Sequence, residues 1–81
     1  MKQVGQEVTV TLTPGGSPRS LTWCGRTYPV GTVEDEWRLG GRWWLGERPC
    51  TCYLLQAGAL TAELHQEDGP QGRWWLARVQ D

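Results

Sequence analysis

The sequence contains no phenylalanine, isoleucine or asparagine, and lysine and histidine occur once each. Without phenylalanine and isoleucine, the apolar interior must be built from tryptophan, leucine, valine and tyrosine, and six tryptophans are many for a small domain. A chain of 81 residues supports one domain and buries roughly 60% of its unfolded surface, so its interior is small. We therefore expect a single domain over residues 1–81, built around tryptophan.

Several classes of protein are excluded by features that the sequence lacks. No apolar run approaches the roughly 20 residues of a membrane span, so we expect no membrane partner. The opening residues, MKQVGQEVTV, lack the apolar core of a signal peptide. Three cysteines cannot all pair within one chain, so we expect a cytoplasmic protein in a reducing compartment. A net charge of −1 also lacks the basic excess of a broad nucleic-acid surface.

The spacing of glycine and proline leaves little room for long helices, and the segments between them alternate apolar with polar side chains. Their short connections favour antiparallel neighbours, because parallel crossovers need a dozen residues or more. We therefore expect an all-β fold, an antiparallel meander of six or seven strands curled into a small barrel or roll. The alternating segments from which these strands would form are residues 7–12, 20–23, 26–30, 33–39, 42–46, 51–56, 59–65 and 73–79.

Short sequence patterns predict the position of one turn, an alternative helical turn and the side chains that face the interior. Cys24 and Gly25 are expected to form a two-residue hairpin loop, because glycine accepts a positive φ. Residues 32–37 (TVEDEW) can form one helical turn as an alternative to a strand. In residues 73–79, alternation places Trp75, Ala77 and Val79 on the face opposite Trp74 and Leu76. The side chains that we expect to be largely buried are Trp23, Tyr28, Val30, Trp37, Tyr53, Leu64 and Val79.

The pentapeptide GRWWL occurs twice, at residues 41–45 and 72–76. We expect each copy to follow a turn and to open a strand. Adjacent strand residues face opposite ways, so one ring of each tryptophan pair should point inward and the other outward. A large exposed aromatic ring is unusual unless a partner covers it. The alternative is that arginine stems or neighbouring loops cover the outward rings.

Signatures of catalysis are missing. The sequence has no phosphate-binding GxxxxGK motif and no GxSxG nucleophile elbow. His65 stands on the polar face of its predicted strand, with no local sign of a nucleophile beside it. Alternation splits the acidic run of residues 34–36 across two faces, which is typical of a solvated strand edge. We therefore predict no catalytic residues and no enzymatic activity.

Cys24, Cys50, Cys52 and His65 together have the ligand count of a structural zinc site. The C-x-C spacing is not the usual zinc-finger spacing, Cys24 lies in a different hairpin, and His65 would have to reach in from the outer face of a later strand. The pattern thus favours three free thiols that act as small apolar side chains. We predict no metal and no cofactor.

Arginines beside tryptophans suggest that the protein can bind single-stranded nucleic acid. Arg38, Arg42, Arg73 and Arg78 all lie near tryptophans, and small barrels stack single-stranded bases on such aromatic platforms. The same arginines can instead pair with Glu34, Glu36 or Glu47 or stack on tryptophan inside the fold.

The ordered set LTWCGRTYPV, WR, GRWWLGE, a tyrosine strand and a final WWLAR resembles a family of small Trp-rich bacterial domains of unknown function. The resemblance covers residues 19–81 and follows the pattern W-x-G-R-x-Y-x-V, W-R, GRWW and W-L-x-R. Members occur in high-GC bacteria, alone or beside error-prone translesion polymerases and the inactive polymerase-like subunit of the mutasome. The resemblance implies an accessory role in DNA damage tolerance, without enzymatic activity.

Two functions follow from these patterns. The first is a non-enzymatic interaction module that docks on a translesion polymerase or mutasome subunit. The second is a small barrel that binds single-stranded DNA. Near-neutral charge favours the first. The residues that we expect to bind the partner are Arg38, Arg42, Trp43, Trp44, Arg73, Trp74 and Trp75.

Overall fold

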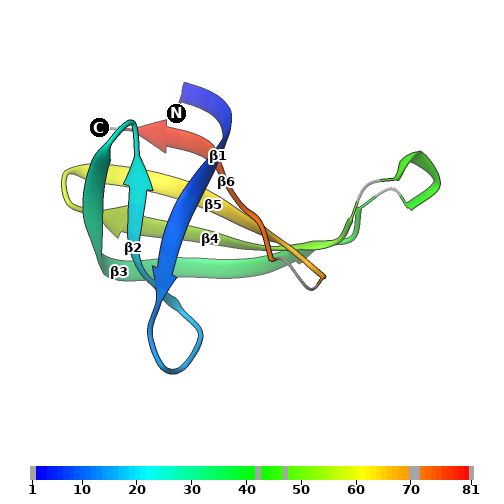
Figure 1. Ribbon diagram of the computed structural model, residues 1–81, viewed down its shortest axis with the longest axis horizontal. Coiled ribbons are helices and arrows are strands. Elements are labelled where there is room, and N and C mark those ends of the chain that lie inside the picture. Colours follow the sequence, from blue (N-terminus) through cyan, green and yellow to red (C-terminus); the bar gives the residue numbers. More distant parts are fainter. Residues whose placement is uncertain (1, 42, 47, 70–71, 81) are drawn as a thin grey trace.

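Six strands form the fold in the computed structural model, which describes residues 2–41, 43–46, 48–69 and 72–80, Trp43 by its backbone alone. They are β1 (Lys2–Leu12), β2 (Pro18–Trp23), β3 (Arg26–Leu39), β4 (Cys50–Ala57), β5 (Leu60–Glu67) and β6 (Trp74–Gln80). Each strand pairs antiparallel with the next, and β6 returns to β1 to close a barrel (Figure 1). This confirms the predicted all-β antiparallel barrel.

The alternating segments merge into fewer strands than their number suggests. Residues 26–30 and 33–39 form one continuous strand, β3, so residues 32–37 are extended and not helical. Residues 42–46 were expected to be a strand, and this prediction is wrong, because Trp43–Leu45 forms a short 3-10 helix, η1. Strands β3 and β4 pair with each other only as far as Leu39 and Cys50. Among the described residues between them, none pairs with a strand, so no sheet hydrogen bonds hold Trp43–Leu45 in an extended conformation.

Turns and bends follow the glycines. Cys24 and Gly25 connect β2 and β3, with φ of 52° and 75°. Positive φ at both positions is the signature of a tight hairpin turn that matches strand twist, which confirms the predicted loop. In β1, Gly5 has φ of 64° where the register with β6 shifts between Gln3 and Gln6. The first part of β1, to Val8, pairs with β6, and the part from Thr9 onward pairs with β2.

The core lies inside the barrel and is formed mainly by β4, β5 and β6. Leu21, Leu55, Leu64 and Leu76 have no exposed surface. Tyr53 packs against Trp74, with ring centroids 5.5 Å apart. The remaining members of the core are Ala57, Leu60, Ala62 and Val79.

Of the side chains predicted to be buried, Tyr53, Leu64 and Val79 are buried. The other four side chains are less buried than predicted, because each is only half-buried: Trp23, Tyr28, Val30 and Trp37. Trp23, Tyr28 and Val30 pack against the margin of the core, where β2 and β3 leave one side open to solvent. Trp37 pairs with Cys52 on β4 and shares the outer face of the barrel with it, away from the core residues Tyr53 and Leu55.

A bulge in β6 changes which side chains share a face. In β6, Leu76 pairs with Leu64 and Arg78 with Glu63, so Ala77 is an extra residue. Val79 therefore joins Trp74 and Leu76 in the core, and the predicted grouping of Val79 with Trp75 is wrong. A bulge displaces one strand relative to its neighbour without any change in the apolar pattern, so alternation alone does not reveal it.

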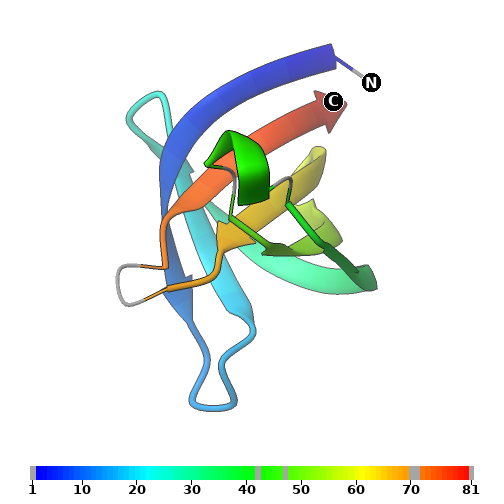
Figure 2. The same cartoon turned by 90° about the vertical axis from the view of Figure 1, so that its right-hand side faces the viewer.

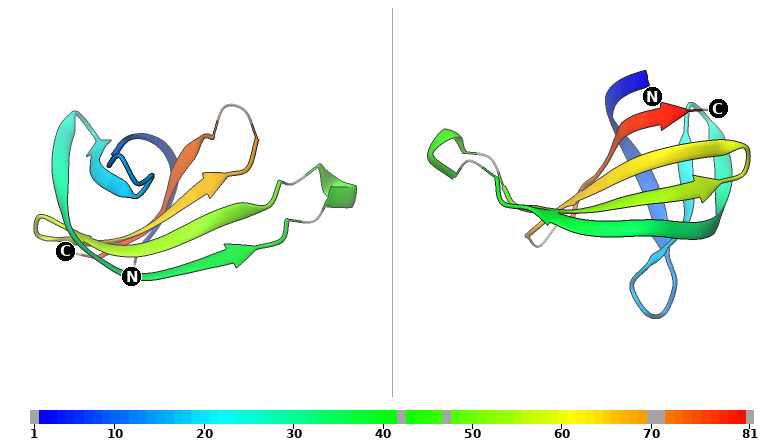
Figure 3. Two further views of the ribbon diagram at one scale, coloured as in Figure 1. Left: turned by 90° about the horizontal axis from the view of Figure 1, so that it is seen from below. Right: turned by 180° about the vertical axis from the view of Figure 1, so that it is seen from behind.

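A loop between β3 and β4 stands away from the barrel. We call residues 40–41, 43–46 and 48–49 the projecting loop; η1 lies at its end (Figures 1 and 3). It contributes to an elongated shape of 38 × 30 × 24 Å. None of the helical structure in the described part of the chain has the length and apolarity that a membrane crossing requires.

Candidate functional sites

The projecting loop carries the most exposed apolar side chains among the described residues. Trp44 is 64% exposed and Leu45 is 62% exposed, and both belong to η1 (Figure 2). Leu39, the last residue of β3, adds a third apolar side chain that is 46% exposed. An apolar cluster on a protruding loop is a surface that a protein partner can cover.

The base of the loop is fixed by close backbone contact. A Cβ atom placed on Gly41 would lie 2.6 Å from the carbonyl carbon and oxygen of Arg48, so only glycine fits there without a shift. On the other side, the backbone N–H of Asp68 donates to the carbonyl of Pro49 over 2.9 Å. These contacts hold the two ends of the loop together and against the end of β5.

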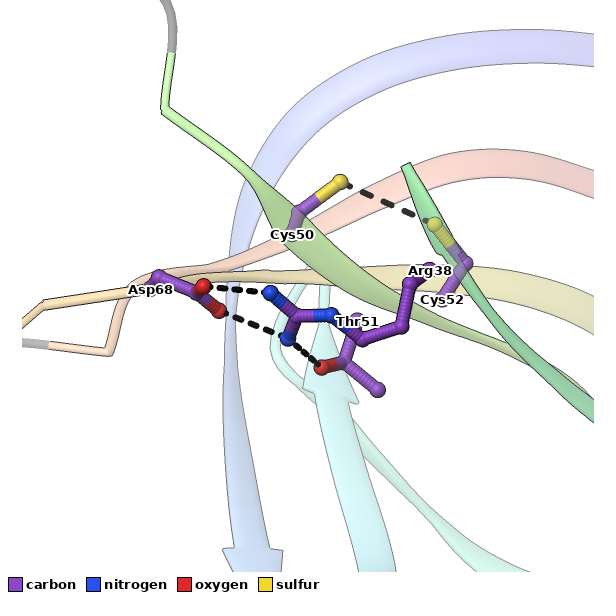
Figure 4. A network of polar contacts seen from close by, with 5 residues as sticks. All are labelled: Arg38, Cys50, Thr51, Cys52 and Asp68. Carbon is purple, nitrogen blue, oxygen red and sulfur yellow. Dashed lines mark hydrogen bonds and ion pairs between the residues drawn. The ribbon is translucent and has the colours of Figure 1, made fainter. Parts of the chain in front are cut away.

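Arg38 fastens β3 to the segment after β5 (Figure 4). Its guanidinium donates to both carboxylate oxygens of Asp68 over 3.0 and 2.5 Å, and Nη1 donates to Thr51 Oγ1 over 2.7 Å. These hydrogen bonds, assisted by the positive charge, hold the pKa of Asp68 below its ordinary value. The expected partners of Arg38 were glutamates of the neighbouring segments, whereas its partner, Asp68, comes from the loop between β5 and β6.

The second GRWWL copy has the predicted inward and outward rings. Trp74 is 7% exposed and belongs to the core. Trp75 is half-buried on the outer face, where its Nε1 donates to Glu67 Oε1 over 3.1 Å. Arg73 precedes them as an exposed residue. Of this copy, Trp75 and Arg73 thus have surface available to a partner.

The first copy differs because it is not a strand. Trp44 is exposed in η1, while Arg42 and the side chain of Trp43 lie outside the described residues. The two identical pentapeptides therefore occupy different structural settings, one in the projecting loop and one at the start of β6.

A second candidate site lies on the outer face of β4 and β5. Cys50 and Cys52 share this face because they are two residues apart on β4, and His65 is paired directly with Cys52. The two sulfur atoms are 3.7 Å apart, and one ligand atom from each residue lies within 4.8 Å of the others. The cluster does not include Cys24, which is exposed in the hairpin turn between β2 and β3. The four-residue set considered from the sequence is therefore reduced to three.

The burial of Cys52 and the carboxylate of Glu63 determine the chemistry of this cluster. Cys52 has no exposed surface, and burial, followed by its hydrogen bond to Cys50, raises its pKa to about 12. Cys52 is therefore a thiol at neutral pH and not a reactive nucleophile. His65 Nε2 lies 2.6 Å from Glu63 Oε2, and Arg78 Nε lies 3.5 Å from the other oxygen of the same carboxylate. Glu63 is only 8% exposed, so this pairing offsets its burial.

The cluster opens onto a cleft that reaches the projecting loop. The cleft has a volume of about 550 Å³. It is lined by Gly46, Arg48, Cys50, His65, Glu67 and Trp75. The chemistry that these groups offer at the floor of the cleft is metal coordination by sulfur and imidazole nitrogen.

Comparison with family models, with curated proteins and with solved structures finds no match to this chain. The fold class therefore rests on the structure, which shows a closed six-stranded antiparallel β-barrel. The resemblance of residues 19–81 to the Trp-rich bacterial domains stays a prediction.

Proposed function

We propose that this protein is a non-enzymatic module that docks on another protein through its projecting loop. The observation that carries the proposal is the exposure of Trp44 and Leu45, at 64% and 62%, on a short helix that stands away from the barrel. Tryptophan is enriched among the few residues that supply most of the free energy of protein binding. A ring that is presented in this way loses much of its contact with water when a partner covers it.

The proposed partner is a translesion polymerase or the inactive polymerase-like subunit of the mutasome, as the resemblance implies. Single-stranded DNA receives less support from the arginines. Arg38 is already bound to Asp68, and Arg78 lies next to Glu63. Phosphate binding would have to compete with these carboxylates, and the net charge of −1 supplies no general attraction for nucleic acid.

The test is binding to the purified polymerase and mutasome subunit, measured by calorimetry for the wild type and for Trp44→Ala and Leu45→Ala. We expect each variant to weaken binding by about thirtyfold, the equivalent of about 2 kcal/mol for an interface hot spot. Leu12→Ala is the matched control, because Leu12 is also an exposed leucine, 43% accessible, at the end of β1 and outside the projecting loop. This control should bind like the wild type.

Two results would contradict the proposal. One is unchanged binding after both loop substitutions. The other is binding to single-stranded DNA that falls steeply with salt concentration, since such a dependence reports the release of counterions from phosphates. An apolar protein contact through the projecting loop should change little with salt.

A further inference from the structure

We propose that Cys50, Cys52 and His65 bind one zinc-class transition-metal ion on the outer face of the barrel. The three side chains come from neighbouring strands in direct register, two from β4 and one from β5. They lie on the face opposite the core, and none of them belongs to the core cluster. Cys52 itself has no exposed surface, so the site adjoins the packed interior of the barrel. The proposal does not depend on the docking function proposed above.

The spacing of the two sulfur atoms fits a tetrahedral ion, and the imidazole lies near enough to join them by a small side-chain movement. With zinc–sulfur bonds of about 2.3 Å, two thiolates of a tetrahedron stand about 3.8 Å apart. Cys50 Sγ and Cys52 Sγ are 3.7 Å apart, and the imidazole completes a set of donor atoms within 4.8 Å. A disulfide would instead require the sulfurs to approach to about 2.05 Å.

Glu63 orients the histidine as metal sites require. Metal-bound histidines generally donate their second ring N–H to a carboxylate or carbonyl, which fixes the tautomer and the orientation of the ring. His65 Nε2 is 2.6 Å from the Glu63 carboxylate, so in the tautomer that donates to Glu63 the other ring nitrogen, Nδ1, would offer its lone pair to the ion. Arg78 and burial keep Glu63 in place. Glu63 is thus a positioning residue and not a ligand.

The types of ligand atom and the access to the site through the cleft determine which class of metal ion can bind. Thiolate and imidazole favour zinc and similar borderline metals over magnesium and calcium, which prefer oxygen. Binding releases the two thiol protons, so the two thiolates balance the charge of a divalent ion. Cys50 and His65 line the cleft of about 550 Å³, which is a path for entry. The described residues supply three ligands, which leaves a fourth position for water or a group from a partner.

The test is titration of the reduced, metal-free full chain with Co²⁺, followed by displacement with Zn²⁺. We expect one Co²⁺ per chain, the visible bands of a four-coordinate ion and a near-ultraviolet thiolate charge-transfer band. Zn²⁺ should abolish these bands. If the reduced protein binds neither ion stoichiometrically, the proposal is overturned.

Variants identify the ligands. Cys50→Ser and His65→Gln should abolish stoichiometric binding while circular dichroism shows an intact barrel. Cys24→Ser is the matched control, since Cys24 is a thiol outside the cluster, and it should bind Co²⁺ like the wild type. Glu63→Gln should keep the four-coordinate bands but weaken affinity about 10–100-fold. Loss of binding in Cys24→Ser, or wild-type spectra and affinity in folded His65→Gln, would overturn the assignment.

Discussion

At the scale of single residues, the tryptophans show that one residue type serves different purposes in one small chain. Trp74 fills the core against Tyr53, where its ring excludes water. Its neighbour Trp75 is half-buried on the outer face and satisfies its N–H with Glu67. Trp44, in the same pentapeptide context as Trp75, is exposed at the projecting loop. What differs is the presence or absence of a neighbouring strand.

These different environments predict that replacing each tryptophan by alanine lowers the free energy of unfolding by a different amount. Trp74→Ala should lower the free energy of unfolding by about 3–5 kcal/mol, because it removes a buried ring and leaves a cavity. Trp44→Ala should lower it by only about 0.5 kcal/mol, as expected for a surface position. Urea denaturation followed by circular dichroism measures both values. Equal losses for the two variants would contradict the assignment of Trp44 to a surface role.

At the scale of elements, the β3–β4 hairpin decides where the binding residues stand. The two strands continue to Leu39 and Cys50, and the projecting loop begins where their pairing ends. Its base depends on the close approach of Gly41 to the backbone of Arg48 and on the ion pair of Arg38 with Asp68. The loop is thus positioned by contacts outside the core.

Gly41→Ala should displace the projecting loop, because the added methyl group would lie 2.6 Å from the backbone of Arg48. Gly40→Ala is the matched control, since a Cβ atom there meets nothing within 4 Å. Backbone NMR spectra should show shifts confined to the loop for Gly41→Ala and only local changes for Gly40→Ala. Identical spectra for the two variants would argue against the close contact.

The pairing of Arg38 with Asp68 predicts a dependence of stability on pH. The pKa of Asp68 is lower in the folded protein than its ordinary 3.8, so the stabilisation is present above that value and is lost as pH falls through the folded pKa. Asp68→Asn should therefore be slightly less stable than the wild type at pH 7, and the difference should vanish in strong acid. Both side chains are about half exposed, so salt should also reduce the difference. Urea denaturation across this pH range measures it, and a difference that persists in strong acid and high salt would refute the role of the ion pair.

At the scale of the whole molecule, closure of the barrel separates two environments. The apolar core is enclosed by all six strands, while the Cys50, Cys52 and His65 cluster lies on the outer face. Pairing of β6 with β1 closes the barrel, which leaves fewer unpaired strand edges than an open sheet would have. We therefore expect the barrel to fold without a bound metal ion.

This separation predicts the effect of metal on stability. A chelator should leave the metal-free barrel folded, unlike a zinc finger, which unfolds when its metal is removed. Added Zn²⁺ should raise the melting temperature. At a Zn²⁺ concentration one hundred times Kd, binding should add about 2.7 kcal/mol to the free energy of unfolding. Thermal unfolding of the reduced protein with and without Zn²⁺ measures this. Unfolding by the chelator alone would show that the ion is structural.

Much of the fold is determined locally and was predictable from the sequence. Alternation with short turns specified antiparallel strands, and the apolar pattern correctly placed Tyr53, Leu64 and Val79 among the buried side chains. The turn at Cys24 and Gly25 was predictable because it depends on two residues alone. The alternation of apolar and polar side chains and the tight turns both depend on consecutive residues, so they can be predicted from the local sequence.

The tertiary structure decided what depends on partners distant in sequence. The bulge at Ala77 moved Val79 into the core, and the lack of a neighbouring strand turned Trp43–Leu45 into a 3-10 helix. The thiol–imidazole cluster depends on register. The turn after β4 pairs Ala57 with Leu60, and counting back from this pair places His65 opposite Cys52, whereas a shift of one residue would place them on opposite faces. Alternation along one strand contains no information about its register against the next, because register is set by the turn and by packing between strands.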